Sequence, residues 1–76
     1  MLIKVKFFAS LRDDFGKEAV CEVDQNSRVE DLFHKMKIPK DLTKIVLVNG
    51  KSIEGNMDYL LSDGDTISIF PPIGGG

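Results

Sequence analysis

The residues best suited to chemistry lie at the C-terminus. The sequence closes with a strand-like pair, two prolines, an isoleucine and three glycines: Ile69-Phe70-Pro71-Pro72-Ile73-Gly74-Gly75-Gly76. Three glycines contribute little to a fold, because glycine loses more conformational freedom on ordering than any other residue. They would instead form a slim tail that carries the α-carboxylate of Gly76 up to about 20 Å beyond Pro71. We expect this tail to enter the active site of another protein.

A carboxylate at the end of such a tail reacts only after activation, and adenylation activates it as a mixed anhydride with AMP. The chain has no Gly-x-x-x-x-Gly-Lys-Ser/Thr loop and no Gly-x-Gly-x-x-Gly motif. Its terminal glycines cannot cradle a phosphate, since no helix follows them. A partner protein would therefore have to supply the ATP site. The alternative is a C-terminus without a function.

Length and composition indicate one small domain. The chain has 76 residues, 42% of them hydrophobic and 29% charged, and its core is too small to enclose an active site. Ten basic against 12 acidic residues argue against a nucleic-acid partner. No apolar run approaches the ~20 residues of a membrane span, and residues 1–8 read as a strand, not a signal peptide. A single cysteine, Cys21, forms no internal disulfide, which favours a reducing cytoplasm.

The elements that must position the tail are predicted from hydrophobic periodicity and turn residues. Ile3, Val5 and Phe7 share one face of a strand at 2–9, and the lysines between them mark the other face, with Phe8, as solvated. Arg12–Gly16 is polar and predicts a turn or short helix. Further strands are predicted at about 19–24, 44–48, 51–53 and 66–70.

Turns separate the later strands. Asn49-Gly50 is typical of a tight hairpin turn, and Ser62–Asp65 of a polar turn. Leu60 and Leu61 are expected to anchor another turn in the core.

One helix is predicted from Ser27 to just before Pro39. Ser27 and Glu30 match the capping box, in which the serine caps the helix and the glutamate reaches back to the serine N–H. An apolar stripe follows at i, i+3, i+4 and i+7: Val29, Leu32, Phe33 and Met36.

The order ββαββ, with a short extra strand or turn before the last strand, predicts an α+β fold of the ubiquitin-like β-grasp type. One amphipathic helix would pack across a mixed sheet of four or five strands. The first and last strands would lie side by side and parallel, joined by a right-handed crossover. Residues 1–70 would form the domain, and residues 71–76 a flexible tail that leaves from its edge.

Four segments of the chain closely resemble the MoaD/ThiS family of ubiquitin-like sulfur carriers. They are Phe7-Phe8-Ala9-Ser10-Leu11-Arg12, Val48-Asn49, Ser62-Asp63-Gly64-Asp65 and Phe70-Pro71-Pro72-Ile73-Gly74-Gly75-Gly76. The most specific feature is the Asp-Gly-Asp turn followed by a strand, two prolines and terminal glycines. The resemblance covers essentially the whole chain and is closest to the small subunits of molybdopterin synthase.

The resemblance implies a carrier without a catalytic side chain, cofactor or metal of its own. A ubiquitin-activating-enzyme-like adenylyltransferase would adenylate Gly76, and the acyl-adenylate would become a thiocarboxylate. The tail would then enter the large subunit of molybdopterin synthase and give its sulfur to a pyranopterin precursor. Two deliveries build the dithiolene that holds molybdenum or tungsten. The partner-binding residues implied are Phe8, Phe70, Pro71, Pro72, Ile73, Gly74 and Gly75.

Other functions share this pattern. Archaeal ubiquitin-like modifiers are similar and would join Gly76 to lysines of target proteins. The ending Gly74-Gly75-Gly76 is one glycine richer than the usual form and is similar to that of carriers for thiamine synthesis. Gly50–Ser52 stands where the family often has an apolar residue. A simple interaction module with an inert tail is a third possibility.

The remaining polar candidates have structural explanations. Cys21 alternates with apolar neighbours and is expected to be a small buried thiol. His34 is expected to be a solvated residue on the flank of the helix, and one histidine makes no metal site. Asp63 and Asp65 form a carboxylate pair that turn chemistry explains.

Overall fold

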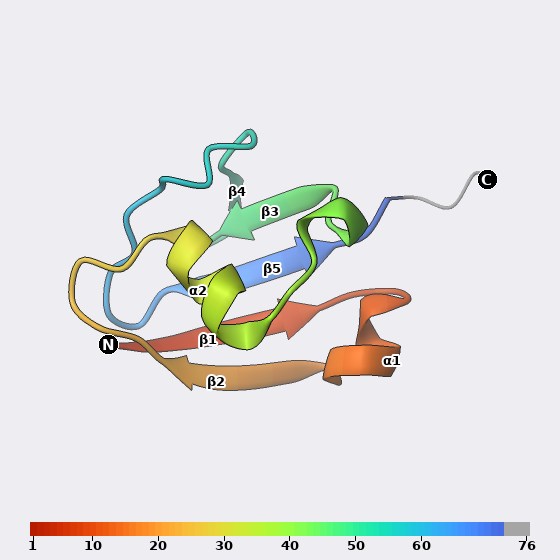
Figure 1. The fold of residues 1–76 in the computed structure, drawn as a ribbon, viewed down its shortest axis with the longest axis horizontal. Helices are drawn as coiled ribbons and strands as arrows, with labels where there is room; N and C mark the ends of the chain where they lie inside the picture. Colours follow the sequence, from red (N-terminus) through yellow and green to blue (C-terminus); the bar gives the residue numbers. More distant parts are fainter. Residues whose placement is uncertain (73–76) are drawn as a thin grey trace.

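The structure, a computed structural model, describes residues 1–72. Its strands form one sheet in the order β2-β1-β5-β3-β4, and the helix α2 packs across one face of this sheet (Figure 1). In chain order the elements are β1 (Leu2–Phe7), α1 (Leu11–Phe15), β2 (Glu18–Glu22), α2 (Val29–Met36), the 3₁₀ helix η1 (Lys40–Leu42), β3 (Ile45–Val48), β4 (Lys51–Ser52) and β5 (Thr66–Phe70).

The sheet is mixed, and its two central strands are parallel. β1 pairs antiparallel with β2 and parallel with β5, while β3 pairs antiparallel with both β5 and β4. The predicted β-grasp arrangement, with the first and last strands side by side, is confirmed. The sequence predicts that the first strand continues to residue 9, but β1 ends at Phe7. The reason is that Ala9 has a positive φ of 53°, which a strand does not accommodate.

The core lies between the sheet and α2. Ile3, Val5 and Phe7 are fully buried on the inner face of β1, as their alternation predicts. The apolar stripe of α2 faces them: Val29, Leu32 and Phe33 are buried and Met36 is half-buried. Each fully buried side chain of this size contributes about 1.5–3 kcal/mol relative to an exposed one, so this layer carries most of the stability.

The helix α2 begins one residue later than the sequence predicts. Arg28 is the N-cap, and the Asp31 side chain accepts a hydrogen bond from the Arg28 N–H at 2.8 Å. Ser27 is buried in the preceding turn, where its carbonyl accepts from the Leu61 N–H at 2.9 Å. The predicted capping box of Ser27 and Glu30 is therefore wrong, because the long-range bond to Leu61 holds Ser27 outside the helix.

The two leucines before β5 differ in environment. Leu61 is 3% exposed and packs in the core as predicted, whereas Leu60 is 49% exposed and the prediction for it is wrong. The Leu60 backbone instead forms an antiparallel bridge with Arg28. Adjacent residues of an extended segment point to opposite sides, so only one of the two can reach the core.

A polar clasp, formed by Asn49, Ser62 and Asp65, fixes the start of β5. The Asp65 carboxylate is 8% exposed and accepts from Asn49 Nδ2 at 2.9 Å and from the Ser62 N–H at 2.7 Å. Asn49 Oδ1 in turn accepts from the Thr66 N–H at 2.9 Å. Asn49 and Gly50 have φ values of 51° and 85°, as the predicted hairpin turn requires. The clasp thus ties the β3–β4 turn to the first residue of β5.

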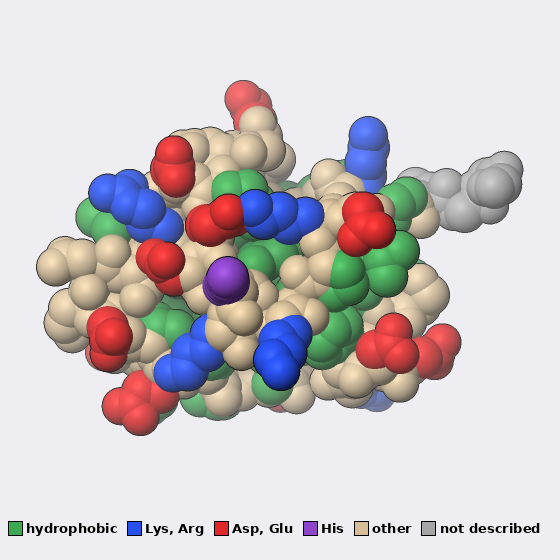
Figure 2. All heavy atoms as spheres, in the orientation of Figure 1, with side chains coloured by type: hydrophobic (Ala, Val, Ile, Leu, Met, Phe, Trp, Pro, Cys, Tyr) green, Lys and Arg blue, Asp and Glu red, His purple; other side chains and the backbone are tan. Residues whose placement is uncertain are grey.

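The face that carries α2 is polar and of mixed charge. Figure 2 shows Lys or Arg and Asp or Glu side chains interspersed over this face, with hydrophobic groups between them. Within residues 1–72, no helix combines the length and the apolar character needed to cross a membrane.

Candidate functional site

One end of the sheet, which we call the exit end, is where the chain leaves the fold. The parallel strands β1 and β5 both finish there, α1 follows β1 at this end, and Pro71 and Pro72 continue from β5 (Figure 1). Strand β3 begins at the same end, because it runs antiparallel to β5. The topology therefore brings the start of the tail beside the segment that follows β1.

Three apolar side chains form a row across the exit end, on the sheet face that α2 leaves uncovered. Phe8 lies just after β1, Phe70 on β5 and Ile45 on β3; we call these three residues the exit row. Ile45 is the register partner of Phe70, and the Phe8 N–H donates to the Ile69 carbonyl at 3.2 Å. The alternation of β1 and β5 thus places two aromatic rings beside each other on the outer face.

The two rings of the exit row stack face to face. The centroids of Phe8 and Phe70 lie 4.3 Å apart with an interplanar angle of 11°. Both residues are half-buried, and Ile45 is 43% exposed. Phe8 lies on the lysine-bearing face as predicted, although its ring is half-covered by Phe70 and not fully solvated. Stacked aromatics beside an aliphatic side chain are the composition of a protein interface core.

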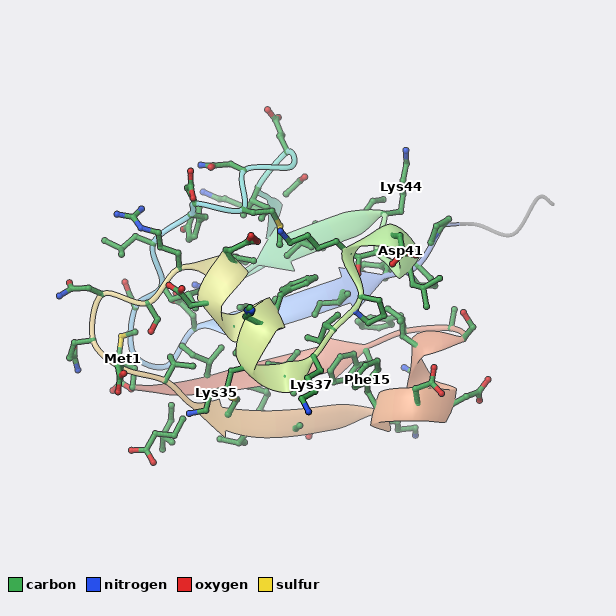
Figure 3. All side chains as sticks on the ribbon, in the orientation of Figure 1. Met1, Phe15, Lys35, Lys37, Asp41 and Lys44 are labelled. Atoms are coloured by element: carbon green, nitrogen blue, oxygen red, sulfur yellow. The ribbon has the colours of Figure 1, made fainter. Side chains whose placement is uncertain are left out.

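An open groove of about 850 Å³ adjoins the exit row. It is lined by Ala9, Ser10, Lys44, Ile45, Phe70, Pro71 and Pro72. The Lys44 N–H donates to the Phe70 carbonyl at 2.7 Å, which holds the last residue of β5 against the start of β3. The Lys44 side chain projects outward near the point where the chain leaves β5 (Figure 3). Pro71 and Pro72 form one wall, so the tail begins inside a largely apolar surface.

Arg12 extends this surface on the side of β1. Its Nε donates to the Phe7 carbonyl at 2.9 Å, and its guanidinium carbon lies 5.2 Å from the centroid of the Phe8 ring. The supporting helix α1 is fixed by buried Leu11 and by Phe15, which is labelled in Figure 3. The centroids of the Phe15 and Phe7 rings lie 4.9 Å apart, and the rings are stacked. Arg12, Phe8 and Phe70 therefore form one continuous stack.

The structure brings together the predicted site residues that it describes. Phe8 and Phe70 are in contact, Pro71 is half-buried and Pro72 is exposed. Predictions for Ile73, Gly74, Gly75 and Gly76 fall outside the described residues and stay predictions. That Phe8, Phe70 and the two prolines bind a partner stays a prediction as well.

Two residues of this surface, Ile45 and Arg12, were not singled out from the sequence. Ile45 could have been predicted, because an apolar residue at the start of a strand that pairs with the last strand can lie directly opposite Phe70. Arg12 lies in a family-like segment, but its position over Phe8 depends on the turn at Ala9 and could not be inferred from spacing.

The other polar candidates lie away from the exit end or serve the fold. Asp65 accepts from the Ser62 N–H within the turn, as predicted, whereas Asp63 Oδ1 accepts from the distant Leu2 N–H at 2.8 Å and ties the turn to β1. Turn chemistry thus explains Asp65, and a long-range bond explains Asp63. Cys21 is half-buried and packs against the core, and His34 is exposed. Among residues 1–72, no group of three or more His, Cys, Asp or Glu side chains could hold a metal. The exit end therefore presents aromatic and aliphatic side chains together with the Arg12 guanidinium.

Comparison with known proteins decides the family. Residues 5–76 match the ThiS family. The chain belongs to this family of ubiquitin-like proteins. It is 33% identical to the molybdopterin synthase sulfur carrier subunit of Escherichia coli, over 99% of this chain and all of that protein. It is also 28% identical to small archaeal modifier protein 3 of Haloferax volcanii, with both chains covered completely.

Solved structures agree with the observed fold. A putative molybdopterin converting factor subunit 1 from Pyrococcus furiosus superposes with a TM-score of 0.80 and 27% identity, covering 96% of this chain and 99% of that one. Subunits 1 and 2 of molybdopterin-converting factor from Helicobacter pylori were solved as a complex, and one chain of that structure matches with a TM-score of 0.72 over the whole of both chains. At 22% identity that second likeness concerns the fold alone. The chain is thus a ubiquitin-like protein of a family that contains both sulfur carriers and protein modifiers.

Proposed function

We propose that this chain is a sulfur carrier that serves as the small subunit of molybdopterin synthase. Its Gly76 would be adenylated and then converted to a thiocarboxylate. The observation that carries the proposal is that, in a chain of the ThiS family, three terminal glycines follow shortly after Phe70, which belongs to the exit row. The 33% identity to a molybdopterin synthase sulfur carrier subunit supports this role over the others in the family.

The proposed chemistry takes place in two steps at Gly76. First, a carboxylate oxygen of Gly76 attacks the α-phosphate of ATP, and pyrophosphate leaves as the acyl-adenylate forms. Second, hydrosulfide from the sulfur source attacks the acyl carbon, AMP leaves with the former carboxylate oxygen, and the thiocarboxylate remains on Gly76. The sequence has no nucleotide-binding motif, so an adenylyltransferase partner provides the ATP site. This chain contributes the reacting carbon and the surface by which the partner holds it.

The two parts of the chain divide this work. Residues 1–70 form a rigid base, and residues 71–76 serve as the tail. Two successive prolines favour a stiff, extended exit, and Ile73, Gly74 and Gly75 give a slim approach to a narrow channel. Phe8 and Phe70 dock the partner, first the adenylyltransferase and then the large subunit of molybdopterin synthase. Stacked aromatics suit this role, because rigid rings lose little conformational entropy on binding.

Intact-mass analysis tests the proposal. The chain is co-expressed with the adenylyltransferase and a sulfur source, and a matched variant lacks Gly75 and Gly76. We expect the full chain to gain one sulfur in place of one oxygen, and the shortened variant to remain unchanged. An unmodified full chain in the presence of an active adenylyltransferase would contradict the proposal.

A second candidate function is conjugation to proteins, which the 28% identity to small archaeal modifier protein 3 favours. Lys51 is the last basic residue of the chain, so trypsin would leave a long remnant, residues 52–76, on a target lysine. An Ile73→Arg variant shortens that remnant to three glycines. Such remnants on lysines of cellular proteins would establish conjugation; their absence under conditions that form the thiocarboxylate would restrict the chain to sulfur transfer.

A further inference from the structure

Arg12 is held in place before any partner arrives. One donor, Nε, is bound to the Phe7 carbonyl at 2.9 Å, and the guanidinium carbon lies 5.2 Å from the centroid of the Phe8 ring. Two contacts of different kinds therefore fix its orientation beside the exit row. A side chain ordered in this way loses little further conformational entropy when it binds a partner group.

The remaining donors of Arg12 have no acidic partner in the part of the chain that is described. Within residues 1–72 the one ion pair joins Lys40 and Glu30, on the other face of the sheet. Asp13 and Asp14 follow Arg12 directly on α1, and residues one or two apart on a helix do not face each other. The side chain thus presents a charged, exposed fork at the rim of an apolar surface. Arginine is enriched at protein interfaces, and its fork matches a carboxylate bidentately.

We propose that Arg12 receives an aspartate or glutamate carboxylate of the partner protein that covers the exit row. The inference rests on the proposed function and names the chemistry of its docking step. A carboxylate is favoured over a nucleotide phosphate because of distance. Adenylation takes place at Gly76, which an extended tail separates from the exit row by up to about 20 Å. The partner would therefore have an acidic side chain beside the entrance to the channel that admits the tail.

Binding measurements with purified wild-type chain, Arg12→Gln and Arg12→Lys test this proposal. The probes are the large subunit of molybdopterin synthase and the adenylyltransferase from the same organism, each titrated at several salt concentrations. Lys51→Gln is the matched control, because it also removes one positive charge from an exposed side chain. Lys51 lies on β4, an edge strand that is separated from β1 by β5 and β3. Melting temperatures establish that each variant is folded.

We expect Arg12→Gln to weaken binding of at least one probe by about tenfold or more and to flatten its salt dependence. Arg12→Lys should recover only part of the affinity, because an ammonium cannot form the bidentate pair. Lys51→Gln should bind like the wild type. In a second experiment, Arg12→Glu should regain affinity when the partner's acidic residue is replaced by arginine.

Two results would overturn the proposal for Arg12. One is wild-type affinity in Arg12→Gln for both probes, within about twofold. The other is a loss of affinity with an unchanged salt dependence, which would mean that Arg12 only supports the Phe8 ring. Either result, together with a thiocarboxylate at Gly76, would leave the proposed function intact. A wild-type chain that binds neither probe and forms no thiocarboxylate would contradict both.

Discussion

Strand β5 starts in a closed polar network and ends in an open apolar surface. At its start, the Asp65 carboxylate is nearly buried and both of its oxygens accept hydrogen bonds from the clasp. At its end, Phe70 is half-buried and stacks on Phe8 beside a groove of about 850 Å³. Both environments lie on one strand of five residues, Thr66–Phe70.

This difference distinguishes residues that stabilise the fold, in the clasp, from residues that the fold exposes to a partner, in the exit row. Residues of the family-like segments occur at both ends: Asn49 and Asp65 in the clasp, Phe8 and Phe70 in the exit row. Similarity to the family thus does not by itself identify a binding residue. Polar atoms that are satisfied inside the chain point to stability, whereas exposed aromatic surface and an arginine without an acidic partner within residues 1–72 point to binding.

The largest effect is expected from truncating both rings of the exit row. Phe8→Ala with Phe70→Ala should weaken binding to the large synthase subunit by at least about 100-fold, because two hot-spot side chains are lost. The free energy of unfolding should fall by only about 1–2 kcal/mol, since both rings are half-exposed. Calorimetric titration and chemical denaturation measure the two quantities. Val20→Ala is the control, because Val20 is on the same sheet face and 65% exposed. An equal loss of affinity in Val20→Ala and in the double variant would contradict a specific binding role for the exit row.

The reverse pattern is expected at the clasp. Asp65→Ala leaves two donors unsatisfied and should lower the free energy of unfolding by about 3 kcal/mol, with a fall in Tm of about 12 °C or more. Affinity for the partner, measured well below both melting temperatures, should not change. Asp65→Asn retains one acceptor and should lose less stability. A folded Asp65→Ala chain that binds poorly would show that the two ends are coupled.

An intermediate effect on binding is expected from Ile45. Ile45→Ala should weaken partner binding by about tenfold, because the side chain lies at one end of the row and is already partly solvated. Its free energy of unfolding should change by less than about 1 kcal/mol. The same titration measures the affinity. Wild-type affinity in this variant would restrict the docking surface to the two aromatic rings.

The smallest effect is expected at Gly50, in the turn that the clasp holds. Its φ is 85°, and no heavy atom lies within 4 Å of an added Cβ, so Gly50→Ala probes backbone conformation alone. It should lower the free energy of unfolding by about 1 kcal/mol. Gly50→Asn should cost less, because asparagine tolerates this conformation. A stabilised Gly50→Ala chain would contradict the assigned turn.

The parts of the fold predicted from sequence are those set by local periodicity. The alternation of β1 and the stripe of α2 identified the core, and Asn49-Gly50 identified a turn. The failures arose from contacts between distant residues. The sequence pattern predicts Ser27 as the N-cap, but the Ser27 carbonyl accepts from the N–H of Leu61, 34 positions later in the chain, and Arg28 is the N-cap. The sequence also predicts Leu60 in the core, although only its neighbour Leu61 is buried.

The candidate site was predictable in a similar measure. The outward phase of Phe8 and Phe70 follows from period-two alternation, and their contact follows from the parallel pairing of the first and last strands. The clasp and the position of Arg12 could not be predicted, because Asn49 and Asp65 are 16 residues apart and meet only in the folded sheet. The guanidinium of Arg12 reaches Phe8 only through the turn at Ala9.

We propose that sulfur moves from Gly76 to a pterin, and a transfer experiment can follow that sulfur. The thiocarboxylated chain is mixed with the large subunit of molybdopterin synthase and the pyranopterin precursor, and the sulfur content of chain and product is followed by mass spectrometry. We expect the chain to return to its carboxylate form, and two thiocarboxylates to be used for each dithiolene formed. A chain that keeps its sulfur in the presence of active large subunit and precursor would contradict the proposed function.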